Sequence, residues 1–225
     1  MKRMYNLAIR WKKAALNPVN SVEFLKDPPG RTRYLTIEEA NRLIECCSTQ
    51  LRPIVITALN TGMRRSEILG LQWKQVHIES MIEPYIELTQ TKNNRIRNVP
   101  INDELLETFE DLKGKHQGLV FIGERGKLLK SIRTNFDKAL EKAGIVDFHF
   151  HDLRHTFASH FIMQGGDPLA LKEILGHHSL KMVERYTHLA QAHKRKQVNN
   201  LSGLFTVRHL NATSSRIVNL DSDTS

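Results

Sequence analysis

A short stretch in the second half of the chain, HFHDLRHTFASH (residues 149–160), concentrates side chains that could do chemistry. His151 and His155 stand four residues apart with Asp152 between them, which is the spacing of a zinc site on a helix. Arg154 shares the helix face of His151, and its permanent charge opposes a dication. An imidazole and a guanidinium suit a phosphate better, because the first moves a proton and the second binds two oxygens. The pattern favours phosphate chemistry and leaves a zinc hydrolase as a distant alternative.

The other histidines of the stretch are expected at the surface or the core edge: His149, His155 and His160.

The composition indicates a soluble globular protein with a polyanionic partner. Of the 225 residues, 40% are hydrophobic and 25% are charged, and the formal net charge is +9. The two cysteines, Cys46 and Cys47, are adjacent in a predicted helix, which is a poor geometry for a disulfide. No apolar run approaches membrane-spanning length, and no cleavable leader is recognisable at the N-terminus. These features predict a cytoplasmic protein, associated with the nucleoid if its partner is DNA.

The hydrophobic periodicity predicts a mainly helical α+β fold with one small antiparallel sheet. Strands are expected at residues 85–89 and 96–101, joined by a polar turn, with residues 76–78 as a candidate third strand. A capping box at Thr36–Glu39 starts the main domain after a linker at residues 26–33. Helices are expected at residues 3–16, from 37 to 47, from 53 to 59, and at 102–113, 131–143, 151–164, 168–175 and 187–200.

Four strings of the sequence together resemble the tyrosine recombinases, the phage integrase family. They are TGMRRSEILGLQW (61–73), TKNNRIRNVPI (91–101), HDLRHTFASH (151–160) and LGHHSLKMVERYTH (175–188). Each string is a modest match by itself, but four in the family's order are a specific signal. The resemblance spans roughly Arg31 to Leu201 and implies the catalytic domain of that family.

The resemblance assigns roles to residues in the first two strings. It implies that Arg64 is the first phosphate-binding arginine, with Glu67 orienting it, while the role of Arg65 stays open. Lys92 takes the position of the lysine that protonates the leaving 5′-hydroxyl, which suits a flexible ammonium on a hairpin turn. Without the resemblance, Lys92 would be read as ordinary polar turn chemistry.

The last two strings complete the catalytic set that the resemblance implies. His151 takes the position of the base, Arg154 that of the second arginine, and His177 that of a hydrogen-bond donor to the phosphate. Tyr186 takes the position of the nucleophile, and its polar flanking residues predict that it is not deeply buried. His178 has no assigned role.

The implied activity is site-specific recombination of double-stranded DNA through a 3′-phosphotyrosine intermediate. Because the covalent link preserves the phosphodiester energy, the family needs neither ATP nor a metal, and no cofactor is expected. The implied assembly is a monomer alone and a homotetramer on DNA, with accessory DNA-bending proteins as further partners and no membrane partner.

The expected organisation has three parts. Residues 1–30 are interpreted as the last helix of a core-binding domain with its linker, 31–200 as the catalytic domain, and 201–225 as a tail that could dock on a neighbouring subunit. The chain is expected to be a fragment or the product of a truncated gene. Two alternatives stay open: a DNA-binding remnant of a mobile element that does not cleave, and a type IB topoisomerase-like nicking and resealing activity.

Overall fold

The computed structural model of the chain describes residues 1–23, 33–81, 83–90, 95–114, 118–123, 129, 131–190 and 198–202. The chain divides into two compact units, Met1–Thr32 and Arg33–Ser225. The interior of the expected linker and nearly all of the expected tail lie outside the described residues. None of the described helices combines the length and the apolar surface needed to cross a bilayer.

The first unit contains a helix, α1 (Lys2–Arg10), and a 3-10 helix, η1 (Pro18–Ser21). The prediction of a single helix over residues 3–16 is wrong beyond Arg10. Lys12 adopts a left-handed conformation (φ 56), which a continuing α-helix does not allow. The Asn17 side chain then donates a hydrogen bond to the carbonyl oxygen of Lys2 (3.1 Å) and turns the chain back on α1.

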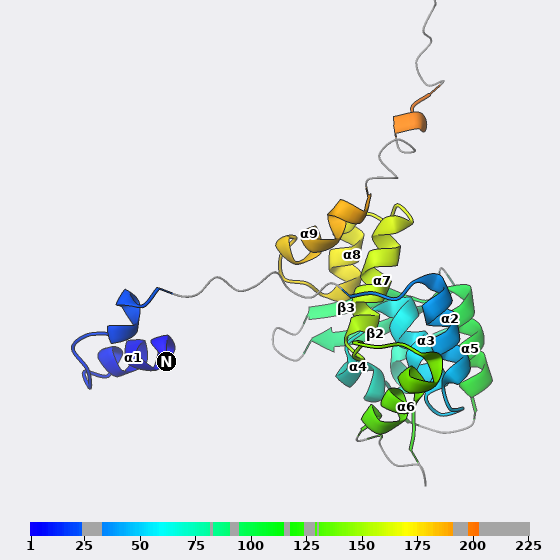
Figure 1. Cartoon of the computed structure of the whole chain (residues 1–225), viewed down its shortest axis with the longest axis horizontal. Coiled ribbons are helices and arrows are strands. Elements are labelled where there is room, and N and C mark those ends of the chain that lie inside the picture. Colours follow the sequence, from blue (N-terminus) through cyan, green and yellow to red (C-terminus); the bar gives the residue numbers. More distant parts are fainter. Residues whose placement is uncertain are drawn as a thin grey trace, which may run out of the picture. The chain divides into compact units, whose positions relative to one another are not determined.

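The second unit is built mainly from helices (Figure 1). Thr36 and Glu39 form the predicted capping box at the start of α2, which satisfies amide groups that no helical carbonyl can reach. Helices α2, α3, α5, α6, α7 and α8 match the predicted ones within about two residues at each end, a difference within the normal uncertainty of helix boundaries, whereas the short helices α4 and α9 were not predicted. The helices are α2 (Ile37–Cys46), α3 (Arg52–Thr61), α4 (Arg65–Leu69), α5 (Asp103–Leu112), α6 (Arg133–Ala143), α7 (Asp152–Met163), α8 (Pro168–Leu175) and α9 (Lys181–Thr187).

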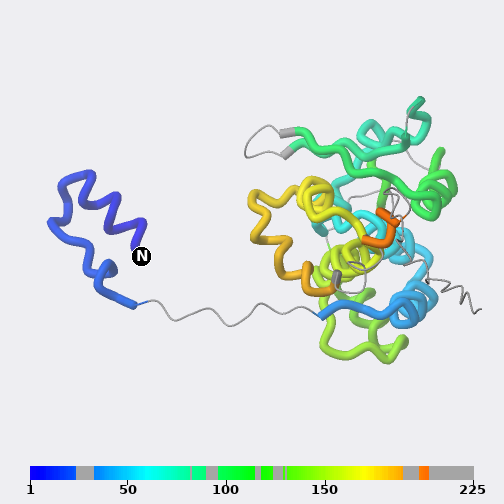
Figure 2. Tube along the Cα trace, turned by 90° about the horizontal axis from the view of Figure 1, so that it is seen from above, coloured from blue at the N-terminus to red at the C-terminus, as the bar shows by residue number. Residues whose placement is uncertain are grey.

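The sheet has three antiparallel strands in the order β1 (Val76–His77), β2 (Tyr85–Gln90) and β3 (Arg95–Pro100). Ile86 pairs with Val99, and both side chains are fully buried on the core face. The predicted hairpin, the third strand and the mainly helical α+β class are confirmed. Helix α8 packs against β3, so the hairpin and the α8–α9 segment lie on the same side of this unit (Figure 2).

The predicted helix at residues 187–200 is wrong over its first residues. Thr187 ends α9 instead of starting a helix, and His188–Ala190 form a 3-10 turn, η4. Val183 and Tyr186, three residues apart on α9, are buried, and η4 also packs against α7. The 3-10 turn is tighter than an α-helix, and it keeps the chain packed on the surface of α7. Residues 191–197 lie outside the described residues.

Two apolar clusters support the second unit. The larger cluster joins α2, α3, α5 and α6 to the sheet, around fully buried residues such as Leu43, Ile54 and Phe109. The smaller cluster joins α7, α8 and α9, and consists of Ala158, Ile162, Leu171, Leu175, Val183 and Tyr186. The candidate catalytic residues of α7 and α9 therefore border a packed layer of their own.

Candidate active site

The turn after α3 brings three helices together. Gly62 ends α3 in the left-handed conformation (φ 60), and a Cβ at this position would lie 2.5 Å from Phe157 and 2.6 Å from Leu175. Both the backbone and the space therefore require glycine. The close approach directs the carbonyl oxygen of Gly62 to Arg154, whose Nη1 donates a hydrogen bond to it at 2.8 Å.

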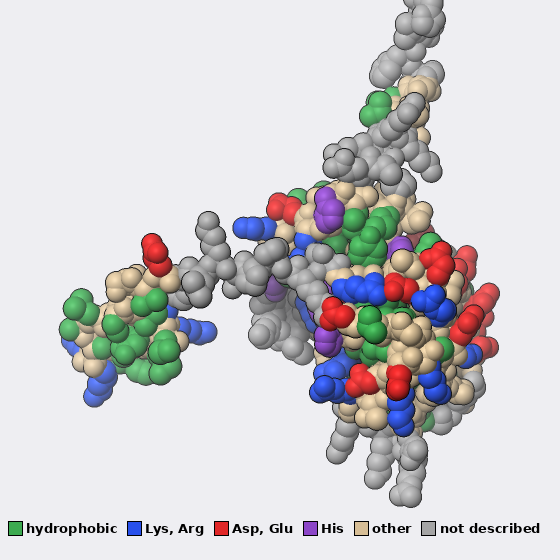
Figure 3. Space-filling view, in the orientation of Figure 1, with side chains coloured by type: hydrophobic (Ala, Val, Ile, Leu, Met, Phe, Trp, Pro, Cys, Tyr) green, Lys and Arg blue, Asp and Glu red, His purple; other side chains and the backbone are tan. Residues whose placement is uncertain are grey.

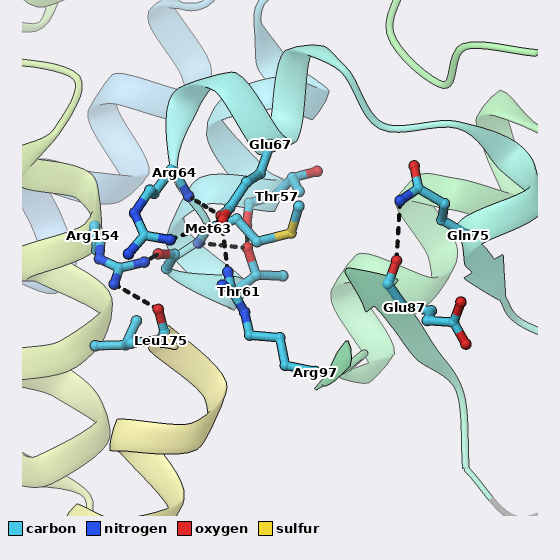
Figure 4. Close-up of polar contacts among 11 residues, drawn as sticks. Thr57, Thr61, Met63, Arg64, Glu67, Gln75, Glu87, Arg97, Arg154 and Leu175 are labelled. Atoms are coloured by element: carbon cyan, nitrogen blue, oxygen red, sulfur yellow. Dashed lines mark hydrogen bonds and ion pairs between the residues drawn. The ribbon is translucent and has the colours of Figure 1, made fainter. Parts of the chain in front are cut away.

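Arg154 is a buried arginine held at both ends of its guanidinium. It lies on α7 with 5% of its surface exposed, and its Nη2 donates to the carbonyl oxygen of Leu175 at 2.7 Å. Both acceptors lie at helix C-termini, where the partial negative charge favours a cation (Figure 4). Burial, followed by the charge of Arg64, lowers the pKa of Arg154 to about 10, so this residue stays charged at neutral pH.

Arg64 and Arg97 share one carboxylate. The Arg64 amide donates to Oε2 of Glu67 at 2.8 Å, and its Nη1 lies 3.0 Å from Oε1. Nη2 of Arg97, which reaches over from β3, lies 2.8 Å from Oε2 of the same side chain. Burial alone would raise the pKa of Glu67, but the Arg64 amide and Arg97 lower it below the ordinary value. Glu67 is therefore ionised and orients both guanidinium groups.

The arrangement leaves an excess of positive charge at one place. Figure 4 shows the guanidinium groups of Arg64 and Arg154 directed toward each other, on the side of Glu67 opposite to the sheet. Nε and Nη1 of Arg97 are buried and have no hydrogen-bond partner among the described residues. Three arginines around one glutamate form a site that favours an anion with several oxygen atoms.

His177 lies beside this cluster, at the end of α8. Gly176 ends the helix with φ 65, and the His177 amide donates to the carbonyl oxygen of Lys172 at 2.9 Å. Burial and the neighbouring Arg154 lower the pKa of His177 to about 4, so the ring is neutral at neutral pH. Its buried Nδ1 has no hydrogen-bond partner among the described residues. Because His177 lines the same pocket as Arg154, the ring can face a ligand there without first breaking a hydrogen bond at Nδ1.

Tyr186 lies on α9 and lines the same pocket as Arg154 and His177. The pocket has a volume of about 340 Å³. The prediction that Tyr186 is not deeply buried is wrong, because only 2% of its surface is exposed. The ring packs in the smaller apolar cluster, and only the hydroxyl end reaches polar neighbours: Tyr186 Oη lies 2.5 Å from Nδ1 of His155.

The histidines of residues 149–160 have different environments. His151 is exposed at the start of α7 and lines the pocket, and its pKa is lowered by desolvation and by Arg154. His149 lies 3.5 Å from the Asp152 carboxylate, and His160 bonds the carbonyl oxygen of Leu35 at 2.8 Å. The last two agree with the structural roles expected for them. Among the described residues, no three histidine, cysteine, aspartate or glutamate side chains cluster as metal ligands would.

The structure thus brings together Arg64, Glu67, Arg154, His177 and Tyr186, with His151 at the edge of the pocket. Lys92 lies outside the described residues. Arg65 and His178 are exposed, whereas Arg64 is half-buried against Glu67.

Sequence reasoning missed two residues of the site, Arg97 and the polar contact of His155. The strand pattern could have indicated Arg97. It stands two residues before the buried Val99 on β3, so the two side chains point to the same face, while the neighbouring Ile96 is 62% exposed. No sequence signal could have indicated the contact between His155 and Tyr186, since α7 and α9 meet only in the tertiary fold.

Comparison with known proteins gives the family. Residues 33–193 match the profile of the phage integrase family, and the chain belongs to this family. It is 35% identical to the integrase of Salmonella phage P22 over 209 residues, which are 87% of this chain and 53% of that protein. The fold is similar to the catalytic domain of bacteriophage HP1 integrase (TM-score 0.57, 35% identity, covering 77% of this chain and 98% of that one). It is also similar to XerA recombinase (TM-score 0.63, 27% identity, covering 90% and 77%).

The chain spans about half the length of the phage integrases it matches. The residues that match the family profile, 33–193, nevertheless include the arginines, the histidines and the tyrosine of the candidate site.

Proposed function

We propose that this chain carries the catalytic domain of a site-specific tyrosine recombinase, which cleaves and rejoins double-stranded DNA through a 3′-phosphotyrosine. The observation that carries the proposal is the convergence of Arg64, Arg154, His177 and Tyr186 around one cationic site. A phosphodiester has the charge and the oxygen atoms that such a set of donors binds.

In this mechanism the two arginines and His177 hold the non-bridging oxygens of the scissile phosphate. The Tyr186 oxygen attacks phosphorus as its proton passes to a neighbouring imidazole, the bond to the 5′-oxygen breaks, and Lys92 protonates the leaving 5′-oxygen to give a 5′-hydroxyl. His151 stands at the pocket edge, where it assists proton transfer. A 5′-hydroxyl of the partner strand then attacks the phosphotyrosine and releases Tyr186. Fixed cations stabilise the transition-state charge, so no metal, ATP or other cofactor is required.

The partners follow from the family and the charge. The net charge of +9 favours DNA, because bound cations release the counterions of its backbone. XerH recombinase, which shares the fold at 20% identity (TM-score 0.61), was solved bound to its difH substrate. We propose a monomer in the free state and a homotetramer on DNA, with the residues after 201 docking on a neighbouring subunit. We also propose that accessory DNA-bending proteins take part, and that the protein acts on nucleoid DNA in the cytoplasm.

A covalent-trapping experiment tests the activity. The chain is incubated with a pool of nicked duplexes of randomised sequence, in which cleavage next to the nick releases a short strand and prevents rejoining. Protein–DNA adducts that survive denaturing electrophoresis are collected and sequenced. Adducts with the wild type and none with Tyr186→Phe are expected. DNA binding without any adduct would instead indicate a non-cleaving remnant.

The trapped duplexes also separate strand exchange from nicking and resealing. A recombinase joins the cleaved strand to a second duplex that carries the same site, while a topoisomerase-like enzyme restores only the original strand. We expect exchange products with full-length duplexes.

A further inference from the structure

The contact between His155 and Tyr186 joins the nucleophile to a residue outside the catalytic set described above. The Tyr186 hydroxyl oxygen lies 2.5 Å from Nδ1 of His155, and the ring centroids are 5.9 Å apart at 43°. Both residues line the pocket that also contains Arg154 and His177. His155 thus touches the atom that would attack the phosphate.

The protonation states of the pair define what each group can donate or accept. Burial raises the pKa of Tyr186 above its ordinary value, so the phenol carries its proton. Burial, followed by the nearby His151 and Arg185, lowers the pKa of His155 to about 4, so this imidazole is neutral. A neutral imidazole carries one hydrogen, and Nδ1 faces the hydroxyl. The phenol donates to Nδ1 when that hydrogen is on Nε2, which is the tautomer that a proton acceptor requires.

We propose that His155, and not His151 as the resemblance implied, is the proton acceptor for the tyrosine nucleophile, and that it holds the Tyr186 hydroxyl at the pocket wall before cleavage. The proposal rests on the proposed recombinase function. As the bond from Tyr186 Oη to phosphorus forms, the phenolic proton moves to Nδ1 of His155, which becomes an imidazolium. The electron pair of the breaking P–O bond leaves with the 5′-oxygen, which takes its proton from Lys92. His155 returns the proton to the phenol when the phosphotyrosine is resolved.

The position of the bound phosphate makes this transfer feasible. In the free protein, the phenol is a much weaker acid than the imidazolium, so the proton stays on Tyr186. A phosphodiester between Arg154 and His177 adds a negative charge to the same pocket, which favours a protonated His155. The phenol also becomes more acidic as its oxygen bonds to phosphorus. Transfer within the attack step needs no preformed phenolate.

Several charged groups surround His155 and affect its pH dependence. Positive neighbours on α7 and α9 oppose protonation, and Asp152 favours it. Among the other elements that pack against α7, α8 carries Lys172 and Glu173, η4 carries His188, and α3 carries only Arg52 at its start. In the free protein His155 is therefore neutral from about pH 5 upward, since its pKa is about 4, and an inflection of the wild-type cleavage rate that belongs to His155 is expected above that value, in the phosphate-bound complex.

The test replaces His155 by asparagine, whose oxygen can accept the hydrogen bond near the Nδ1 position but cannot take the proton. Single-turnover adduct formation is measured on a trapped duplex. We expect His155→Asn to slow cleavage by about 10²-fold or more. We also expect its rate to rise about tenfold per pH unit, because the reaction then depends on the rare phenolate. Added imidazole should partly restore His155→Ala. The matched control is His188→Asn, an exposed histidine two residues after the nucleophile, which should cleave at the wild-type rate.

A sulfur-substituted substrate separates the proton acceptor from the proton donor. When sulfur replaces the leaving 5′-oxygen, the leaving thiolate needs no protonation, because a thiol is much more acidic than an alcohol. This substrate should restore Lys92→Ala but not His155→Asn. Rescue of His155→Asn by the sulfur substrate would overturn the proposal, as would an unchanged rate with the normal substrate. If the wild type forms no adduct, the proposed function itself fails, and the acceptor role fails with it.

A measurement on the free protein checks the geometry without activity. Nitrogen-15 NMR of labelled histidines should show an unprotonated Nδ1 and a protonated Nε2 at His155, and the Nδ1 signal should shift in Tyr186→Phe. The opposite tautomer would contradict the proposed direction of the hydrogen bond.

Discussion

At the scale of residues, a chain of ion pairs leads to Arg64, one of the two arginines proposed to bind the phosphate. Arg97 contacts Glu67, and Glu67 in turn contacts Arg64 through both its carboxylate oxygens. Only 8% of the Arg97 side chain is exposed, so its pairing with Glu67 is little screened by water. We therefore propose that Arg97 is a positioning residue, which acts on the proposed phosphate site through Glu67.

We expect Arg97→Met to reduce adduct formation although Arg97 is not in the catalytic set. Loss of Arg97 removes one of the two donors to Oε2 of Glu67, so the carboxylate, and with it the Arg64 guanidinium, is held less firmly. In a double-mutant cycle with Glu67→Gln, the coupling should be about 0.5–3 kcal/mol, measured both in the free energy of unfolding and in cleavage. If the effects of Arg97→Met and Glu67→Gln were additive, Glu67 would not transmit the effect of Arg97 to Arg64. The exposed Arg65→Met serves as the matched control and should retain the wild-type rate.

At the scale of elements, the ends of α3 and α8 form the support for Arg154. Each of these helices ends in a glycine with positive φ, Gly62 and Gly176, and Arg154 binds the backbone carbonyls beside them. The guanidinium is thereby fixed by backbone atoms, which cannot change rotamer. The fold can hold the second arginine in place before DNA arrives.

We expect Gly62→Ala to cost stability and activity together. A side chain at φ 60 costs about 1–2 kcal/mol, and the contacts with Phe157 and Leu175 add overpacking of about 1–3 kcal/mol. The matched control is Gly144→Ala, which has φ 65 but no atom within 4 Å of the added Cβ. In urea unfolding, Gly144→Ala should lose only the stability that the unfavourable φ costs. In the adduct assay, it should cleave at the wild-type rate. Equal effects of the two substitutions would argue against the packing role of Gly62.

At the scale of the whole molecule, charge is distributed unevenly. The acidic side chains of α5 are exposed and gather along one edge of the second unit (Figure 3). They are Asp103, Glu104, Glu107, Glu110 and Asp111. The arginines of the site lie around α4, β3 and α7 instead. An acidic edge repels the DNA backbone, so this distribution favours approach through the arginine-lined side.

The buried histidines predict how the stability of the whole molecule depends on pH. His155 and His177 each have a pKa of about 4, below the ordinary value of 6.5. Between about pH 4 and 6.5 the unfolded chain binds more protons than the folded one, so stability must fall as the pH falls through this range. Urea unfolding at several pH values should show this loss, and His155→Asn and His177→Asn should each flatten it. Unchanged curves would show that these rings are protonated in the folded state.

The residue types and their order along the chain determined the family, the α+β class and most helix positions. Four short strings in the family's order carried the resemblance to the family, and local signals were sufficient for the helices, because capping boxes, glycine turns and hydrophobic periodicity act over a few residues. The same signals failed at residue 12 and after Thr187, where the chain leaves the helical path in spite of a helical pattern.

Only the tertiary structure decided how the side chains meet. The packing of α9 against α7 buried Tyr186 and placed its hydroxyl on His155, and β3 brought Arg97 to Glu67 across 30 positions of sequence. Long-range contacts of this kind depend on which faces pack together, and polar flanking residues carry no information about that choice. The sequence therefore predicted the candidate reacting groups, while the fold determined their partners, burial and proton affinity.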